Sequence, residues 1–246
     1  MRDGANGYTP AAGIWKIREA VAAAYAAAGM PIGPDRVILT SGTSEGIELA
    51  LSVLVDTGDE VLVPVPTYPF YTAMLAKLGA RSVTYRTDPD NAWMPDLDHI
   101  ESLIGPATRA IVIIDPNNPT GARLDESEVA ELCALAEDLG CWVLADEIYR
   151  GAELDGRDTP SAWGRHDRVI VTGGLSKAYG LPGLRIGWIA GPAELVEQLG
   201  HGARRHHSAS TAPRRRPSPH PGRGPVLHCH RVYRVCQGLA GLSHAS

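Results

Sequence analysis

Four short apolar runs, separated by segments with helical periodicity, constrain the fold of this chain more than any other feature. They are VILT at 37–40, AIVIID at 110–115, WVLAD at 142–146 and VIVTG at 169–173. Each run is apolar throughout rather than alternating, which is typical of strands covered by helices on both faces. Such strands, alternating with helices, predict an α/β fold with a mostly parallel sheet. Ligands bind beyond the carboxyl ends of these strands, so functional residues should follow them.

Periodicity and stop signals place the expected elements along the first 199 residues. We expect helices at 11–28, 44–56, 69–78, 95–103 and 125–139, and strands at 36–40, 60–65, 82–86, 109–115, 141–146, 168–172 and 185–190.

The composition allows a sizeable core and excludes a disordered chain, because 44% of the 246 residues are hydrophobic and 21% are charged. No apolar run reaches the roughly 18 residues of a membrane-spanning helix, and no signal peptide opens the chain. We therefore expect a cytoplasmic protein that does not contact a membrane. The cysteines form no CxxC pair and no zinc-type spacing, so we expect neither a disulfide framework nor a structural metal. They are Cys133, Cys141, Cys229 and Cys236.

The charge distribution divides the chain near residue 200. Residues 1–199 carry 15 Lys and Arg against 28 Asp and Glu, whereas 200–246 carry eight Arg, seven His and no acidic residue. The second segment also lacks helical or strand periodicity. We therefore expect a folded domain at 1–199 and an irregular, basic Arg/His/Pro-rich tail at 200–246. Two hypotheses exist for the tail. In the first, the tail is disordered, or it is translated out of frame or belongs to a damaged gene. In the second, it binds nucleic acid or an acidic partner, which its lack of lysine and its richness in Cys and His disfavour.

The loop after the first expected strand has the composition of a phosphate-binding turn. It runs Thr-Ser-Gly-Thr-Ser-Glu-Gly over 40–46 and opens a helix. Gly42 lets the backbone approach a ligand, while Thr43 and Ser44 add hydroxyl donors at a helix N-terminus, which favours anions. The alternative is an ordinary Ser/Thr N-cap with a turn.

Two further loops carry side chains suited to a planar polar ligand. Tyr68 stands at a strand-to-helix corner, where it could stack on such a ligand or simply pack in the core. Asn118, in the loop PNNPTG at 116–121, offers an amide with both a donor and acceptors. This loop could also be a bare turn.

The segment ADEIY places an acid at the end of a buried strand. Asp146 is costly there unless it meets a cationic partner, for which a pyridinium N–H would serve. Tyr149, three residues later, can direct its phenol at a neighbouring oxygen. The alternative for this segment is an acidic helix cap.

Lys177 is one of only three lysines in the chain, and it alone lies just past a strand, because Lys16 and Lys77 fall on expected helices. Partial desolvation in this Gly-rich loop would make its amine a nucleophile for carbonyls. Arg185, eight residues later, can bind a phosphate with its planar guanidinium.

Together these segments resemble the aspartate-aminotransferase-like (class I/II aminotransferase) family, fold type I enzymes that use pyridoxal phosphate. NNPTG, ADEIY and SKAYGLPGLRIGW occur here in that family's order, and their joint occurrence is far more specific than any one of them. The resemblance covers residues 8–199 and implies that they form the family's large cofactor-binding domain.

The resemblance implies a role for each matching residue. Lys177 would hold the cofactor as a Schiff base and then shuttle the substrate proton, while Asp146 would keep the pyridine nitrogen protonated. Asn118 and Tyr149 would hydrogen-bond the phenolic oxygen of the ring, and Tyr68 would stack on the ring.

The remaining implied roles concern the phosphate and a partner subunit. Tyr8, in GYTPAAG, would reach the phosphate of the second subunit in a homodimer. Gly174 departs from the pattern, because the family often has a hydroxyl residue three positions before the lysine, and Ser176 would compensate. The residues that would hold the phosphate are Gly42, Thr43, Ser44, Ser176 and Arg185.

The ends of the chain also depart from the family's pattern. From the family's pattern we expect that the N-terminal segment covering the substrate pocket is absent before Met1, and that the small C-terminal domain is missing or replaced by the tail. The implied function is an aminotransferase, truncated and impaired, that acts on an amino acid and a 2-oxo acid. The alternatives are a lyase or cyclase of the same fold, and a non-catalytic remnant with a basic interaction tail.

Overall fold

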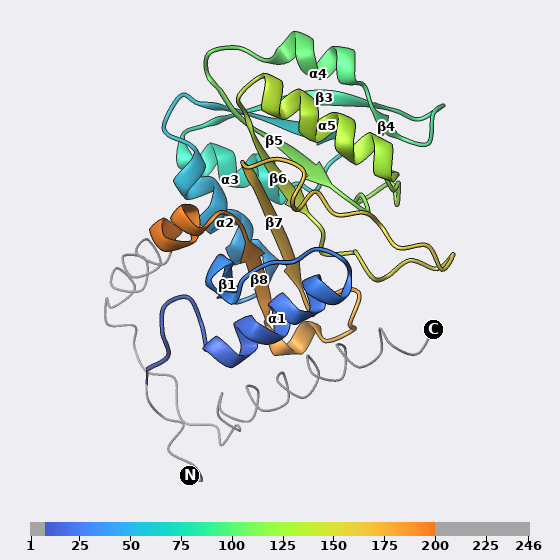
Figure 1. Ribbon diagram of the computed structural model, residues 1–246. Coiled ribbons are helices and arrows are strands. Elements are labelled where there is room, and N and C mark those ends of the chain that lie inside the picture. The colour runs from blue at the N-terminus through green and yellow to red at the C-terminus, as the bar shows by residue number, and fades with distance from the viewer. Residues whose placement is uncertain (1–7, 200–246) are drawn as a thin grey trace, which may run out of the picture.

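An eight-stranded sheet runs through the part of the chain that the computed structural model describes, residues 8–199 (Figure 1). The strand order is β1-β8-β7-β6-β5-β2-β3-β4. The strands are β1 (Val37–Thr40), β2 (Glu60–Val65), β3 (Arg81–Asp88), β4 (Met94–Pro95), β5 (Thr108–Ile114), β6 (Trp142–Asp146), β7 (Val169–Gly174) and β8 (Gly187–Ala190).

Five neighbouring strands, β3, β2, β5, β6 and β7, are parallel, which confirms the prediction of a mostly parallel sheet. The strand β8 is antiparallel to both of its neighbours, β7 and β1. The chain passes from β7 to β8 through residues 175–186 without an α-helix, and parallel neighbours require a longer crossover. The apolar pattern predicts this strand but does not reveal its direction.

Five α-helices pack on the sheet, close to the ranges predicted from the sequence. The first begins four residues later than expected, because Gly13 adopts a positive φ of 94° in a turn closed by its N–H to the carbonyl of Pro10. The helices are α1 (Trp15–Ala27), α2 (Thr43–Leu54), α3 (Phe70–Leu78), α4 (Leu97–Leu103) and α5 (Glu126–Asp138).

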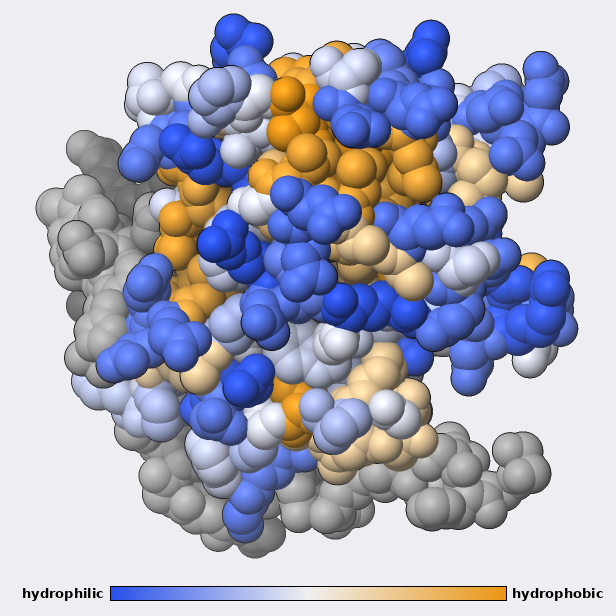
Figure 2. Space-filling view, turned by 45° about the horizontal axis from the view of Figure 1, so that its top comes forward, coloured by the Kyte–Doolittle hydropathy of each residue, from blue (hydrophilic) through white to orange (hydrophobic). Residues whose placement is uncertain are grey.

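The hydrophobic core has two layers, one on each face of the sheet. The helices α1, α4 and α5 cover one face, and α2 and α3 cover the other (Figure 1). Successive residues of β6 alternate between the layers, since Val143 and Ala145 lie in the first and Leu144 in the second. This double covering explains why the strands are apolar throughout. On the face drawn in Figure 2, the hydrophobic residues that reach the surface are bordered by hydrophilic ones.

The sequence predicts a capped helix at 125–139, and the helix α5 begins with a capping box. The Asp125 carboxylate accepts hydrogen bonds from the N–H groups of Ser127 and Glu128, and the Glu128 carboxylate accepts one from the N–H of Asp125.

Within residues 8–199, no helix is long and apolar enough to cross a membrane. In the same range, no group of three or more His, Cys, Asp or Glu side chains could hold a metal ion. The predictions made for the tail at 200–246 lie outside the described residues.

Candidate functional site

A cavity of about 360 Å³ opens at the carboxyl ends of β5, β6 and β7. Nine of the eleven residues predicted from the sequence line this cavity, and Gly42 and Tyr8 do not. Parallel strands end at the same edge of a sheet, so segments far apart in the sequence converge there. The lining consists of Thr43, Ser44, Ile47, Tyr68, Ile114, Asn118, Asp146, Ile148, Tyr149, Ser176, Lys177, Pro182 and Arg185.

Gly42 does not line the cavity but lies next to Arg185, which does. It caps α2 with a positive φ of 89°, and a Cβ at this position would lie 2.5 Å from Nη2 of Arg185. The Arg185 guanidinium donates to the carbonyls of Pro182 (3.2 Å) and Ser41 (3.4 Å), and its own φ is 52°. A non-glycine residue held in this left-handed conformation is strained, which is common at functional sites.

The start of α2 does not carry the Ser/Thr N-cap that the alternative interpretation required. Gly42 is the N-cap and no side chain caps the helix there. The carboxylate of Glu45 instead accepts a hydrogen bond from the N–H of Ser41. The N–H groups at the start of the helix are therefore left for a ligand.

Thr43 occupies the space that a side chain at position 174 would need. Its hydroxyl donates to the carbonyl of Gly173 at 3.2 Å, and a Cβ on Gly174 would lie 2.9 Å from that hydroxyl oxygen. The departure at Gly174 thus has a steric reason, and Thr43 itself lines the cavity.

Asp146 is buried, with only 3% of its surface exposed, and it accepts three hydrogen bonds from neutral groups. The donors are the Tyr71 hydroxyl (3.1 Å), the Thr172 hydroxyl (3.2 Å) and the N–H of Ile148 (3.4 Å). Burial raises its pKa to about 6, although these bonds oppose the rise. No cation is bonded to this carboxylate among the described residues, so it is suited to a cationic ligand.

Tyr71 and Thr172 are functional candidates that were not predicted from the sequence. Tyr71 lies on α3 three residues after Tyr68, where an aromatic residue looks like core packing, but a buried phenol needs a hydrogen-bond partner. Thr172 stands directly opposite Asp146 in the β6–β7 register. The alternative of an acidic helix cap is wrong, because residues 148–151 form a turn rather than a helix.

Lys177 lies in a loop of turns and bends that follows β7. Its Nζ is 5.3 Å from the centroid of the Tyr149 ring. The Lys177 side chain is exposed in the described structure, and partial desolvation of its amine remains a prediction. Tyr68 stacks on Phe70, with ring centroids 5.9 Å apart, and still lines the cavity, so core packing and ligand contact do not exclude each other.

Tyr8 stands apart from the cavity with a fully exposed side chain. Its predicted contact with a partner subunit therefore remains a prediction.

The cavity combines a primary amine, a guanidinium beside a helix N-terminus, a buried carboxylate and an aromatic ring. Such a set suits a planar ligand that carries a phosphate, a reactive carbonyl and a protonated ring nitrogen.

Comparison with known proteins agrees with this geometry. The sequence model of the family described as aminotransferase class I and II matches residues 1–215. Glutamate-pyruvate aminotransferase AlaA of Escherichia coli K12 is 38% identical over 188 residues, which are 75% of this chain and 46% of that protein. Alanine aminotransferase of Mycobacterium bovis is 40% identical over 196 residues, or 77% of this chain and 46% of the relative.

Solved structures give the same result. N-Succinyldiaminopimelate aminotransferase of Mycobacterium tuberculosis matches with a TM-score of 0.83 and 29% identity, over 98% of this chain and 62% of that one. Alanine aminotransferase of Pyrococcus furiosus matches with a TM-score of 0.75 and 35% identity, over 82% of this chain and 54% of that one. The chain spans about half the length of the curated relatives it matches. Because the family model covers most of its residues, the chain belongs to the class I and II aminotransferase family.

Proposed function

We propose that residues 1–199 are the large, cofactor-binding domain of an aminotransferase that uses pyridoxal phosphate and acts on an amino acid and a 2-oxo acid. One observation carries the proposal. The amine of Lys177 and the buried carboxylate of Asp146 line the same cavity, although Asp146 ends β6 and Lys177 lies in the loop after β7. Pyridoxal phosphate, when bound, supplies an aldehyde that condenses with amines and a protonated ring that accepts electrons.

The residues present fit this cofactor at its anionic end. The N-terminus of α2 is free of a side-chain cap, and Gly42 leaves the backbone accessible. Thr43, Ser44 and Ser176 provide hydroxyl donors, and Arg185 provides a guanidinium that is held by two carbonyls. An N-terminus with adjacent donors and a guanidinium favours a phosphate.

The residues also fit the ring. Tyr68 offers an aromatic face, and Asn118 and Tyr149 offer donors for a phenolic oxygen on one edge. Asp146 offers a carboxylate for a protonated ring nitrogen. Its raised pKa supports this role, because burial makes the unpaired anion costly and a cation would remove that cost.

The chain's own groups would then divide the work. Lys177 would hold the aldehyde carbon through Nζ, release it to the amine of the substrate, and move the proton from the substrate's α-carbon. Asp146 would keep the ring nitrogen protonated, so that electrons from the α-carbon flow into the ring. Tyr71 and Thr172 would act through Asp146, because their hydroxyls hold its two oxygens in place.

A nitrogen-transfer experiment tests this proposal. The purified chain would be supplied with pyridoxal phosphate, a ¹⁵N-labelled amino acid and a 2-oxo acid, and we expect ¹⁵N to appear in the newly formed amino acid. The relatives' names make alanine, glutamate, pyruvate and 2-oxoglutarate the first substrates to try. We expect Lys177→Ala to abolish transfer and Lys77→Ala, an exposed lysine paired with Glu48 at 2.6 Å, to leave it unchanged.

Other outcomes would favour the alternatives. Release of ammonia or of an amine, without labelled product, would indicate a lyase of the same fold and would overturn the proposed reaction. Failure to bind the cofactor would indicate a non-catalytic remnant. A homodimer with Tyr8 at the second subunit's phosphate remains part of the proposal, and its test is the mass of the protein in solution together with the effect of Tyr8→Phe on cofactor affinity.

A further inference from the structure

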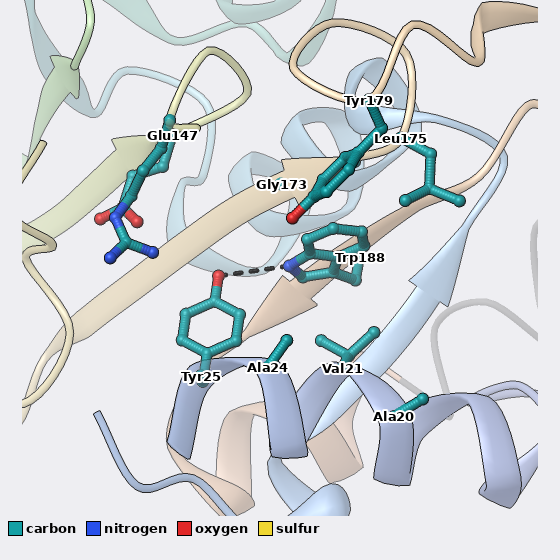
Figure 3. A pocket seen from close by; sticks show the side chains of 11 residues that line it. Ala20, Val21, Ala24, Tyr25, Glu147, Gly173, Leu175, Tyr179 and Trp188 are labelled. Carbon is teal, nitrogen blue, oxygen red and sulfur yellow. Dashed lines mark hydrogen bonds between the residues drawn. The ribbon is translucent and has the colours of Figure 1, made fainter. Parts of the chain in front are cut away.

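A second cavity, of about 80 Å³, lies between α1 and the sheet (Figure 3). We call it the rear cavity. The candidate site is lined instead by α2, which covers the other face of the sheet. The helix α1 forms one wall, and β7, β8 and the loop after β7 form others. Its lining consists of Ala20, Val21, Ala24, Tyr25, Glu147, Arg150, Gly173, Gly174, Leu175, Tyr179 and Trp188.

Glu147 brings an unpaired carboxylate oxygen to the rear cavity. It follows Asp146 directly, and because side chains alternate along an extended chain the two acids face opposite sides of the sheet. Its Oε1 accepts hydrogen bonds from the Ser161 hydroxyl (2.7 Å) and the N–H of Ala162 (3.0 Å). Its Oε2 is fully buried and has no hydrogen-bond partner among the described residues. A buried oxygen of this kind requires a partner.

The other polar groups of the rear cavity are phenols and an indole. The Trp188 Nε1–H donates to the Tyr25 hydroxyl at 3.2 Å, which leaves the phenolic proton of Tyr25 to be donated elsewhere. Glu147 and Tyr179 both act electrostatically on Tyr25, so the three groups lie close together. Figure 3 shows the hydroxyls of Tyr25 and Tyr179 directed into the space between α1 and β7.

The loop that carries Lys177 separates the two cavities. Ser176 and Lys177 line the candidate site, whereas Leu175 and Tyr179 line the rear cavity. Few backbone bonds hold the loop, and two of them are from the N–H of Gly180 to Lys177 and from the N–H of Leu181 to Leu175. Contacts in the rear cavity therefore bear directly on the position of the lysine.

We propose that the rear cavity holds ordered water that joins Oε2 of Glu147 to the hydroxyls of Tyr25 and Tyr179, and that Glu147 is thereby a positioning residue for the Lys177 loop. The volume suffices for a few molecules, since one water takes about 30 Å³ in the liquid. Water suits the site because it can donate to a carboxylate and also accept from a phenol. The guanidinium of Arg150 in the wall disfavours a metal cation there. The importance of the Lys177 loop for catalysis rests on the proposed function. The effect of the rear cavity on the position of the loop does not depend on it.

Amide hydrogen exchange of the cofactor-free protein tests the proposal independently of activity. Tyr179→Phe removes one hydroxyl from the rear cavity, and Glu147→Met removes the carboxylate. We expect both to speed exchange of the hydrogen-bonded amides of Leu175, Gly180 and Leu181 about tenfold, which corresponds to about 1.4 kcal/mol of local stability. Glu147→Gln keeps a polar end group, so we expect exchange at residues 175–181 to stay slow, in contrast to Glu147→Met.

The matched control is Ser161→Ala, which removes a hydrogen bond to Oε1 but leaves Oε2 and the lining of the rear cavity in place. We expect it to speed exchange near residues 159–163 only. Unchanged exchange at 175–181 in Tyr179→Phe and Glu147→Met would overturn the proposal. If Glu147→Met does not fold, Tyr179→Phe against Ser161→Ala decides the question alone.

A crystal structure of the chain gives a second, direct test. Electron density for water within hydrogen-bond distance of Oε2 of Glu147 would support the proposal, and a dry cavity would contradict it. Because neither test involves the cofactor, both can succeed even where nitrogen transfer fails, and the two proposals fail separately.

Discussion

Replacing Asp146 with asparagine should stabilise the cofactor-free protein at high pH while weakening cofactor binding. The carboxylate is buried and bonded only to neutral donors in the described structure, and its folded-state pKa is raised from 3.8 to about 6. The unfolded chain therefore releases this proton more readily than the folded one. The contribution of the Asp146 carboxyl to the free energy of unfolding is fully present below pH 4 and is lost as the pH rises through 6.

The size of the effect follows from the pKa. A rise from 3.8 to about 6 corresponds to about 3 kcal/mol, because each pKa unit is worth about 1.4 kcal/mol. Asparagine has nearly the same shape, accepts a hydrogen bond from Tyr71 or Thr172, and carries no charge at any pH. We therefore expect the advantage of Asp146→Asn in the free energy of unfolding to grow by roughly 2–3 kcal/mol between pH 4 and pH 8.

Urea unfolding followed by circular dichroism at a series of pH values measures this difference. The buried acids Asp115 and Glu147, whose pKa values burial also raises, are present in both proteins and largely cancel. Asp90→Asn, at an exposed turn, is the control and should show no such growth. If the difference between Asp146→Asn and the parent is the same at pH 4 and pH 8, the inference of a costly buried carboxylate is refuted.

Three further substitutions probe the phosphate end, the support of Asp146 and the scaffold. Gly42→Ala places a Cβ 2.5 Å from Arg185 at a positive φ, so we expect a loss of about 1 kcal/mol or more in stability and at least tenfold weaker cofactor binding by equilibrium dialysis. Tyr71→Phe removes a donor to Asp146, which should raise the pKa of that carboxyl further and lower the free energy of unfolding at pH 8 by about 1.5–3 kcal/mol; unchanged urea curves would contradict this. Asp125→Ala removes the α5 cap and should cost about 1 kcal/mol in thermal unfolding without affecting cofactor affinity, and a loss of affinity would show that the scaffold and the site are coupled.

Much of the fold and the site could be predicted from the sequence because the relevant signals are local. The apolar runs mark strands that are covered on both faces, and the residue after each run marks the edge where ligands bind. This logic brings Asp146, Asn118 and Lys177 together without knowledge of the coordinates. The pair Asp125 and Glu128 likewise announces the start of α5 through its spacing alone.

The features that could not be predicted depend on contacts between distant segments. Tyr71 looks like a core residue on α3, and only the packing of α3 against β6 makes it a partner of Asp146. The steric exclusion at Gly174 arises from Thr43, which is 131 positions earlier in the chain. The exposure of Lys177 could not be predicted either, because the sequence of a Gly-rich loop does not reveal what covers it.

The most direct test of the central claim is to map where pyridoxal phosphate becomes attached after reduction with borohydride. The chain has three lysines, Lys16, Lys77 and Lys177, and only Lys177 lines the cavity that also contains Asp146. We expect peptide mass spectrometry to find the pyridoxyl group on Lys177, and to find none in Lys177→Ala. Modification of Lys16 or Lys77 instead, or equal modification of all three lysines, would contradict the account.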